Sequence, residues 1–217
     1  MIQLDRAERL LAYGIAALAG YVDATGFLAA DRYFVSFMSG NTTRLGVELA
    51  QGATPAAVAG GLIVGFTLGV AMGAVVAEHT LRHRKSTVLG LCCALLALAA
   101  VGHALGSTAA FLGGSVLAMG AINNVFRRDG GVALGITYMT GALVRMGEGL
   151  ASLMTGQKGR KGAVASMILW ASLASGAVGG ALASNAVPGV VPWTSPLILL
   201  ALLGFARWIE ARVIRRA

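Results

Sequence analysis

Six long apolar stretches alternate along the chain with short segments that carry Lys and Arg. At 1.5 Å per helical residue, about 20 apolar residues cross a hydrocarbon core of about 30 Å. The pattern therefore predicts six transmembrane helices, of which the fourth and the sixth are short. Their expected ranges are Leu10–Ala30, Pro55–Ala77, Thr87–Gly106, Ala109–Val125, Ala163–Ser184 and Thr194–Ile209.

Two further segments, Tyr33–Ala50 and Val132–Met154, are apolar only in part. Each contains hydroxyl, arginine and glutamate side chains, so neither can face lipid along its whole length. The chain therefore has either eight spans, or six spans and two broken or re-entrant elements.

The basic residues favour six spans. With eight spans and a cytoplasmic N-terminus, the loop that holds Arg82, Arg84 and Lys85 would lie outside, against the positive-inside rule. With six spans only Arg32 lies outside, and Arg44 and Arg145 fall within the two special elements. The cytoplasmic set is then Arg6, Arg9, Arg82, Arg84, Lys85, Arg127, Arg128, Lys158, Arg160, Lys161, Arg212, Arg215 and Arg216. We therefore expect an all-α, multi-pass protein of the bacterial inner (plasma) membrane with both termini in the cytoplasm.

Composition and motifs narrow the function class. Charged residues make up 12% of the 217 residues, about half the fraction of a soluble domain. The net charge of +8 is scattered between apolar runs, which argues against a nucleic-acid partner. The sequence has no GxSxG elbow, HExxH pair, P-loop or paired CxxC motif. We expect no enzyme activity, no cofactor and no metal, with the lipid bilayer and a small solute as partners.

A polar motif recurs in the two halves of the chain at one constant offset. Phe37-Met38-Ser39-Gly40 matches Tyr138-Met139-Thr140-Gly141, and Arg44-Leu45-Gly46 matches Arg145-Met146-Gly147. The expected repeats are residues 1–106, with a broken element at 33–50, and residues 107–217, with a broken element at 132–154. Three spans per half would place the two copies in opposite orientations, which is a 3+3 inverted repeat.

Small residues also recur every four positions, at Gly61, Gly65, Gly69 and Gly73, and at Ser172, Gly176 and Gly180 in the second half. Such faces allow helices to approach closely. Their partner is either the other repeat or a second copy of the chain, so a homo-oligomer through these faces is one option.

The paired motifs resemble those of the YoaK-like family of uncharacterised bacterial inner-membrane proteins. The residues that carry the resemblance are Asp23-Ala24, Met38-Ser39-Gly40-Asn41, Asn123 through Arg127 and Thr137-Tyr138-Met139-Thr140-Gly141. The resemblance covers almost the whole chain. It implies a fold and a compartment, and no substrate.

The motif residues are the candidate binding site. If helices begin at Gly40 and Gly141 within the membrane, their N-terminal N–H groups would attract an anion or a carboxylate. Alternatively, both glycines merely permit close helix contact. The substrate-binding candidates are Asp23, Ser39, Gly40, Asn41, Arg44, Asn123, Thr140, Gly141 and Arg145.

The intramembrane charges have two interpretations. Arg44 with Glu48, and Arg145 with Glu148, have helical spacing for an ion pair that lowers the cost of burial. The functional alternatives are a selectivity arginine held in place by its carboxylate, and a salt bridge that opens when a solute binds. Asp23 is either a site for a coupling ion or an acceptor of hydrogen bonds from Ser36, Ser39 or Asn41.

These features predict a secondary transporter or channel for a small polar solute, with an anionic or carboxylate-bearing solute favoured. The alternatives are a membrane scaffold without a substrate, and a membrane-embedded enzyme that acts on a lipid-soluble substrate.

Overall fold

A computed structural model of the chain describes residues 4–52, 56–80, 82–128, 131–132, 135–156 and 160–215. Most of these residues are helical, and one short β-hairpin connects two of the helices. The helices are α1 (Arg6–Ala29), α2 (Met38–Ala50), α3 (Ala56–His79), α4 (Arg84–Ala104), α5 (Thr108–Ala121), the 3-10 helix η1 (Ile122–Asn124), α6 (Met139–Met154), α7 (Arg160–Ala186) and α8 (Val191–Ile214). The two antiparallel strands are β1 (Arg127–Arg128) and β2 (Gly131–Val132).

Several helix ends follow local sequence signals. Asp5 and Glu8 form a capping box at the start of α1, in which each side chain accepts the backbone N–H of the other residue. Ser107 caps α5 by accepting the N–H of Ala110 at 3.2 Å. Gly52 and Gly106 follow α2 and α4 with φ of 65° and 78°, a conformation that glycine adopts without strain.

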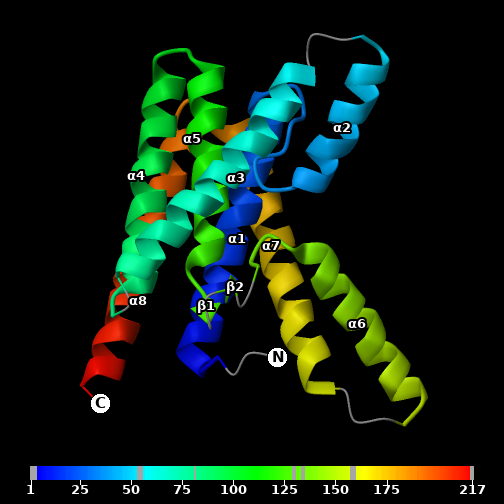
Figure 1. The fold of residues 1–217 in the computed structure, drawn as a ribbon, viewed down its shortest axis with the longest axis vertical. Coiled ribbons are helices and arrows are strands. Elements are labelled where there is room, and N and C mark those ends of the chain that lie inside the picture. The colour runs from blue at the N-terminus through cyan, green and yellow to red at the C-terminus, as the bar shows by residue number, and fades with distance from the viewer. Residues whose placement is uncertain are drawn as a thin grey trace.

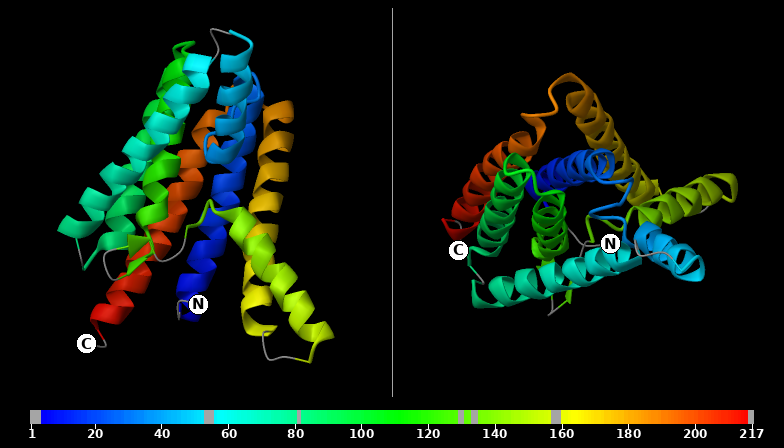
Figure 2. Two further views of the ribbon diagram at one scale, coloured as in Figure 1. Left: turned by 45° about the vertical axis from the view of Figure 1, so that its right-hand side comes forward. Right: turned by 90° about the horizontal axis from the view of Figure 1, so that it is seen from above.

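The long helices form a bundle around α1 (Figures 1 and 2). α1 packs chiefly against α7 and also against α8, while α5 packs against α3 and α4. The α1 side chains Leu11, Ile15, Leu18 and Val22 are at most 1% exposed, which puts the core along this helix. Both chain ends lie at one end of the bundle, together with the strands and the start of α4 (Figure 1).

Among the described residues, four helices are long and apolar enough to cross a membrane: α1, α3, α4 and the part of α7 from Gly162 to Ala186. The helix α5 has only 14 residues before it continues as η1. α8 also runs most of the length of the bundle, from the end opposite the termini back to the C-terminus (Figure 1).

The helices α2 and α6 are short and lie at the periphery. Each packs mainly on one long helix, α2 on α3 and α6 on α7. Both begin partway along the bundle and run in opposite directions, α2 away from the end that holds the termini and α6 toward it (Figure 1). Their starting ends lie near one another in the views of Figures 1 and 2.

The two special elements expected from sequence are helical over only part of their ranges. α2 begins at Met38 and α6 begins at Met139, each two residues before the glycine of the motif, Gly40 or Gly141, at which a helix start was expected. The N–H groups just before each helix bond to a buried side chain of another helix, as described below. The sequence analysis did not predict the hairpin of β1 and β2. The expected second element also included residues 133–134, which lie outside the described residues.

The glycine faces pack within one chain. A side chain at Gly69 or Gly73 would collide with the α5 backbone at Leu117 or Ala121, and one at Gly176 would collide with the α1 backbone at Ala17. Gly61, by contrast, has open space around it. The close approach that these glycines allow is therefore between α3 and α5 and between α1 and α7.

Candidate functional site

Asp23 supports the turn that leads into α2. Its side chain is 6% exposed within α1, and its Oδ1 accepts the backbone N–H groups of Val35 at 2.8 Å and Ser36 at 2.9 Å. The donors are thus backbone groups rather than the side chains of Ser39 or Asn41. This contact gives the carboxylate a structural task, because two buried N–H groups outside a helix need an acceptor. The coupling role of Asp23 stays a prediction.

Asn41 binds the same turn from the α2 side. Its Oδ1 accepts the N–H of Phe34 at 3.1 Å, and its Nδ2 donates to the Phe34 carbonyl at 2.6 Å. The Phe34 ring lies against Gly40, where an added Cβ would stand 2.9 Å from a ring carbon. Gly40 therefore permits a close approach of Phe34.

Asn123 does in the second half what Asp23 does in the first. Its Oδ1 accepts the Thr137 hydroxyl at 3.2 Å and the Thr137 N–H at 3.4 Å, just before α6 begins. Its neighbour Asn124 donates instead to the Val70 carbonyl of α3 at 3.0 Å. Both short helices thus follow a turn that is held by a buried polar side chain of a neighbouring element.

Arg44 is fully engaged in a cluster with Glu48 and Tyr33. Its Nε and Nη2 bond to Glu48 Oε1 at 3.1 and 3.0 Å, and a further nitrogen donates to the Asp31 carbonyl. The guanidinium also lies over the Tyr33 ring at 3.6 Å, and the Tyr33 hydroxyl donates to Glu48 at 2.9 Å.

Arg145 has a different environment, although it occupies the same place in the repeat. Its Nε donates to the Ser166 hydroxyl of α7 at 2.9 Å, and its Nη1 reaches back to within 3.4 Å of a Cβ built on Gly141. Glu148 is exposed, and the ion pairs between described residues do not join it to Arg145. The expected Arg145–Glu148 pair is therefore not formed, because the arginine turns toward the face of α6 that packs on α7.

The first turns of the two short helices also present hydroxyl groups on their outer sides. Ser39 and Thr140 are both exposed in the isolated chain, whereas Asp23, Asn41 and Asn123 are buried. The predicted residues thus divide into buried ones that hold the backbone and exposed or half-buried ones at the helix starts.

Sequence reasoning did not single out Tyr33 and Ser166. Tyr33 meets Glu48 only because the chain reverses between α1 and α2, and no helical spacing signals such a contact. Ser166 is one of several small residues in an apolar stretch, and only the packing of α6 on α7 brings it to Arg145.

Two comparisons place the chain among known proteins. A family model described as "Protein of unknown function (DUF1275)" matches residues 11–205. The "UPF0700 transmembrane protein RA0705" of Rhizobium meliloti (strain 1021) is 36% identical over 203 residues, which cover 93% of this chain and 87% of that protein. No solved structure matches. With its long apolar helices, the chain is a multi-pass membrane protein.

Proposed function

Because the chain belongs to the DUF1275 family, whose function is unknown, we propose from its own geometry that it is a secondary transporter or channel for a small polar solute. The favoured solute is anionic or bears a carboxylate. The observation that carries the proposal is the pair of short helices whose starting ends approach each other partway along the bundle (Figure 1).

The proposed topology has six spans, formed by α1, α3, α4, α5, α7 and α8, with α2 and α6 as re-entrant elements. The two halves, residues 1–106 and 107–217, would form an inverted repeat. The contacts between helices support this proposal. If α1, α2, α3 and α4 are exchanged with α5, α6, α7 and α8 respectively, each main contact becomes a contact that is also present. The contact of α1 with α7 becomes that of α5 with α3, α2 with α3 becomes α6 with α7, and α4 with α5 becomes α8 with α1.

The proposed orientation places both termini in the cytoplasm of a bacterial cell, at its inner membrane. It is supported by the cluster of basic residues at the end of the bundle that holds the termini, where α4 starts with Arg84 and Lys85 and the strand β1 contains Arg127. Such a bias is typical of the cytoplasmic side.

The two helix starts give the proposed site its preference for anions. The N-terminus of a helix carries about half a positive charge, and two such ends that face one another within a membrane add their potentials. Arg145 increases this potential beside Gly141. Among the described residues it pairs with no carboxylate, in contrast to Arg44, whose charge is compensated by Glu48. We therefore assign the main solute contact to Arg145 and a supporting role to Arg44.

Solute binding to the purified full-length protein tests this proposal. Thermal stability is measured with anionic, zwitterionic and cationic solutes, for the wild type, Arg145→Gln and the control Arg9→Gln, an exposed residue near the start of α1. We expect stabilisation by anions that Arg145→Gln abolishes and Arg9→Gln retains, and uptake of the same anion into proteoliposomes.

The opposite result would move the site. Stabilisation by cations alone, undiminished in Arg145→Gln, would contradict the anionic assignment and direct attention to Asp23, Glu48 and Glu148. Complete absence of flux in proteoliposomes would favour a scaffold, and turnover of a lipid-soluble compound would favour an enzyme.

A further inference from the structure

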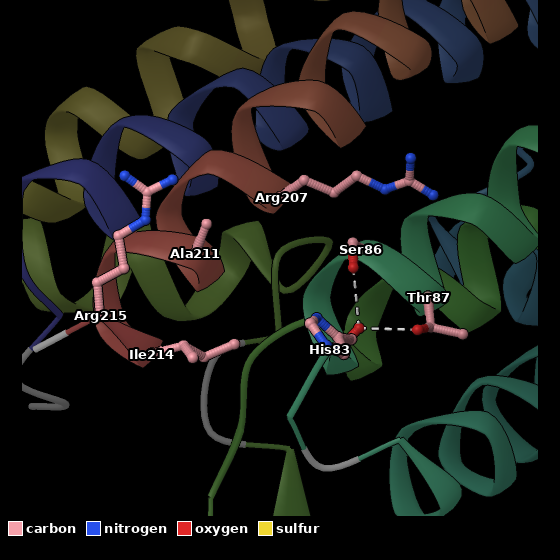
Figure 3. Close-up of a pocket in the computed structure, with 7 residues that line it drawn as sticks. All are labelled: His83, Ser86, Thr87, Arg207, Ala211, Ile214 and Arg215. Carbon is pink, nitrogen blue, oxygen red and sulfur yellow. Dashed lines mark hydrogen bonds between the residues drawn. The ribbon is translucent and has the colours of Figure 1, made fainter. Parts of the chain in front are cut away.

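A pocket of about 510 Å³ lies between the start of α4 and the end of α8, away from the two short helices. His83 and Thr87 line it from the α4 side, and Arg207, Ile214 and Arg215 line it from α8 (Figure 3). The pocket lies at the end of the bundle that holds both termini, where a membrane-spanning bundle meets the headgroup region.

The nearest carboxylate is already compensated. Glu210 is 6% exposed, and its Oε1 accepts the N–H groups of Lys85 at 2.8 Å and Ser86 at 3.2 Å. Its Oε2 accepts the Ser86 hydroxyl at 2.6 Å. Through these bonds the positive N-terminal end of α4 compensates the negative charge of Glu210.

Among the described residues, the two arginines that line the pocket have no such partners. Four ion pairs join the described residues, and neither Arg207 nor Arg215 takes part in any of them. Figure 3 shows Arg207 extending from α8 toward the first turn of α4, while Arg215 lies at the other end of the pocket and points away from it. The His83 ring is largely exposed, with Nδ1 3.7 Å from Glu210. The pocket therefore carries an excess of positive charge.

Exposed apolar residues lie on the same face of α8 as Arg207. Leu197 is 64% exposed and Leu200 is 51% exposed, and Gly204 follows with open space around it. Together with Arg207 they have the spacing of one helix face. Apolar side chains that end in an arginine match a phospholipid, in which acyl chains end in a phosphate group, better than they match a small soluble anion.

We propose that this pocket binds the phosphate group of an anionic phospholipid. Arg207 is its main ligand, since a guanidinium can donate two parallel hydrogen bonds to a phosphate. One acyl chain follows Leu200 and Leu197. A basic pocket between helices at a membrane surface is a typical place for such a headgroup. The bound lipid would bridge α4 and α8, and this inference does not depend on the proposed solute.

Native mass spectrometry of the full-length protein tests the assignment. The protein is released from nanodiscs that contain equal amounts of phosphatidylglycerol and phosphatidylcholine, and the lipids that remain bound are counted. We expect the wild type to retain phosphatidylglycerol in preference. The variant Arg207→Gln should lower this preference about fivefold, as expected for one arginine near a membrane surface. The matched control is Arg212→Gln, whose guanidinium instead lies over the Trp208 ring at 4.6 Å.

Several results would overturn the assignment. One is equal retention of both lipids by the wild type, a measurement that needs no variant to fold. Another is an equal loss of preference in Arg207→Gln and Arg212→Gln. A third arm adds glycerol phosphate to protein in phosphatidylcholine nanodiscs. Thermal stabilisation there as large as that from phosphatidylglycerol would assign the pocket to a soluble phosphate instead of a lipid.

Discussion

Replacement of Asp23 by alanine should destabilise the protein strongly. The side chain is the acceptor for two buried N–H groups, those of Val35 and Ser36, at 2.8 and 2.9 Å. A buried donor without an acceptor costs about 1–3 kcal/mol. The variant should therefore lose about 2–6 kcal/mol of unfolding free energy, twice the cost of one such donor.

Asparagine at the same position separates geometry from charge. Asp23→Asn keeps an oxygen that can accept both N–H groups, and loses only the extra strength of bonds to a charged acceptor. We expect a smaller loss, about 1–2 kcal/mol. Thr25→Ala is a matched control, because the Thr25 hydroxyl is also buried in α1 but, among the described residues, donates to the carbonyl of Val22 in its own helix.

The unfolding free energies of the three variants are compared by adding increasing amounts of dodecyl sulfate to protein in mixed micelles. Loss of helix is followed by far-UV circular dichroism. Hydrogen exchange of the segment that contains Val35 and Ser36 gives a local measurement, which should lose protection in Asp23→Ala alone. If Asp23→Ala is no less stable than Thr25→Ala, Asp23 does not hold the turn before α2.

Three further predictions concern packing, capping and topology. Gly69→Val should reduce the folded yield, because the side chain would meet the α5 backbone, whereas Gly61→Val should be tolerated; size-exclusion chromatography compares them. Glu210→Ala should lower the unfolding free energy by about 1–2 kcal/mol in the same micelle titration, because α4 loses its cap. A cysteine at His83 should resist an impermeant thiol reagent added to intact cells, and labelling from outside would reject the proposed orientation.

Hydrophobic patterning located the helices well. Each of the six apolar stretches contains a helix over most of its length, and the first, expected at Leu10–Ala30, spans Arg6–Ala29. The recurrence of Met-Ser-Gly and Met-Thr-Gly also located the two short helices, because both begin at the methionine of the motif. These features depend on local sequence, which a periodic pattern reports directly.

Contacts across chain reversals could not be predicted. The partners of Asp23 are backbone groups, which every residue has, so no side-chain pattern marks Val35. Helical spacing correctly paired Arg44 with Glu48 but wrongly paired Arg145 with Glu148, because Ser166 on another helix competes for the second arginine. Helical spacing shows which side chains on one helix are close enough to pair, but the packing of other helices determines which of these pairs form.

In the proposed function, the starts of α2 and α6 line a route for a solute. Cysteine accessibility at Ser39 and Thr140, both exposed in the isolated chain, tests it most directly. The background carries serine at Cys92 and Cys93, and a cysteine at Leu98, 65% exposed on α4, reports a position that faces lipid. We predict that a negatively charged, water-soluble thiol reagent modifies positions 39 and 140 but not 98. If all three positions react only with an apolar maleimide, the two helix starts face lipid and the route that we propose does not exist.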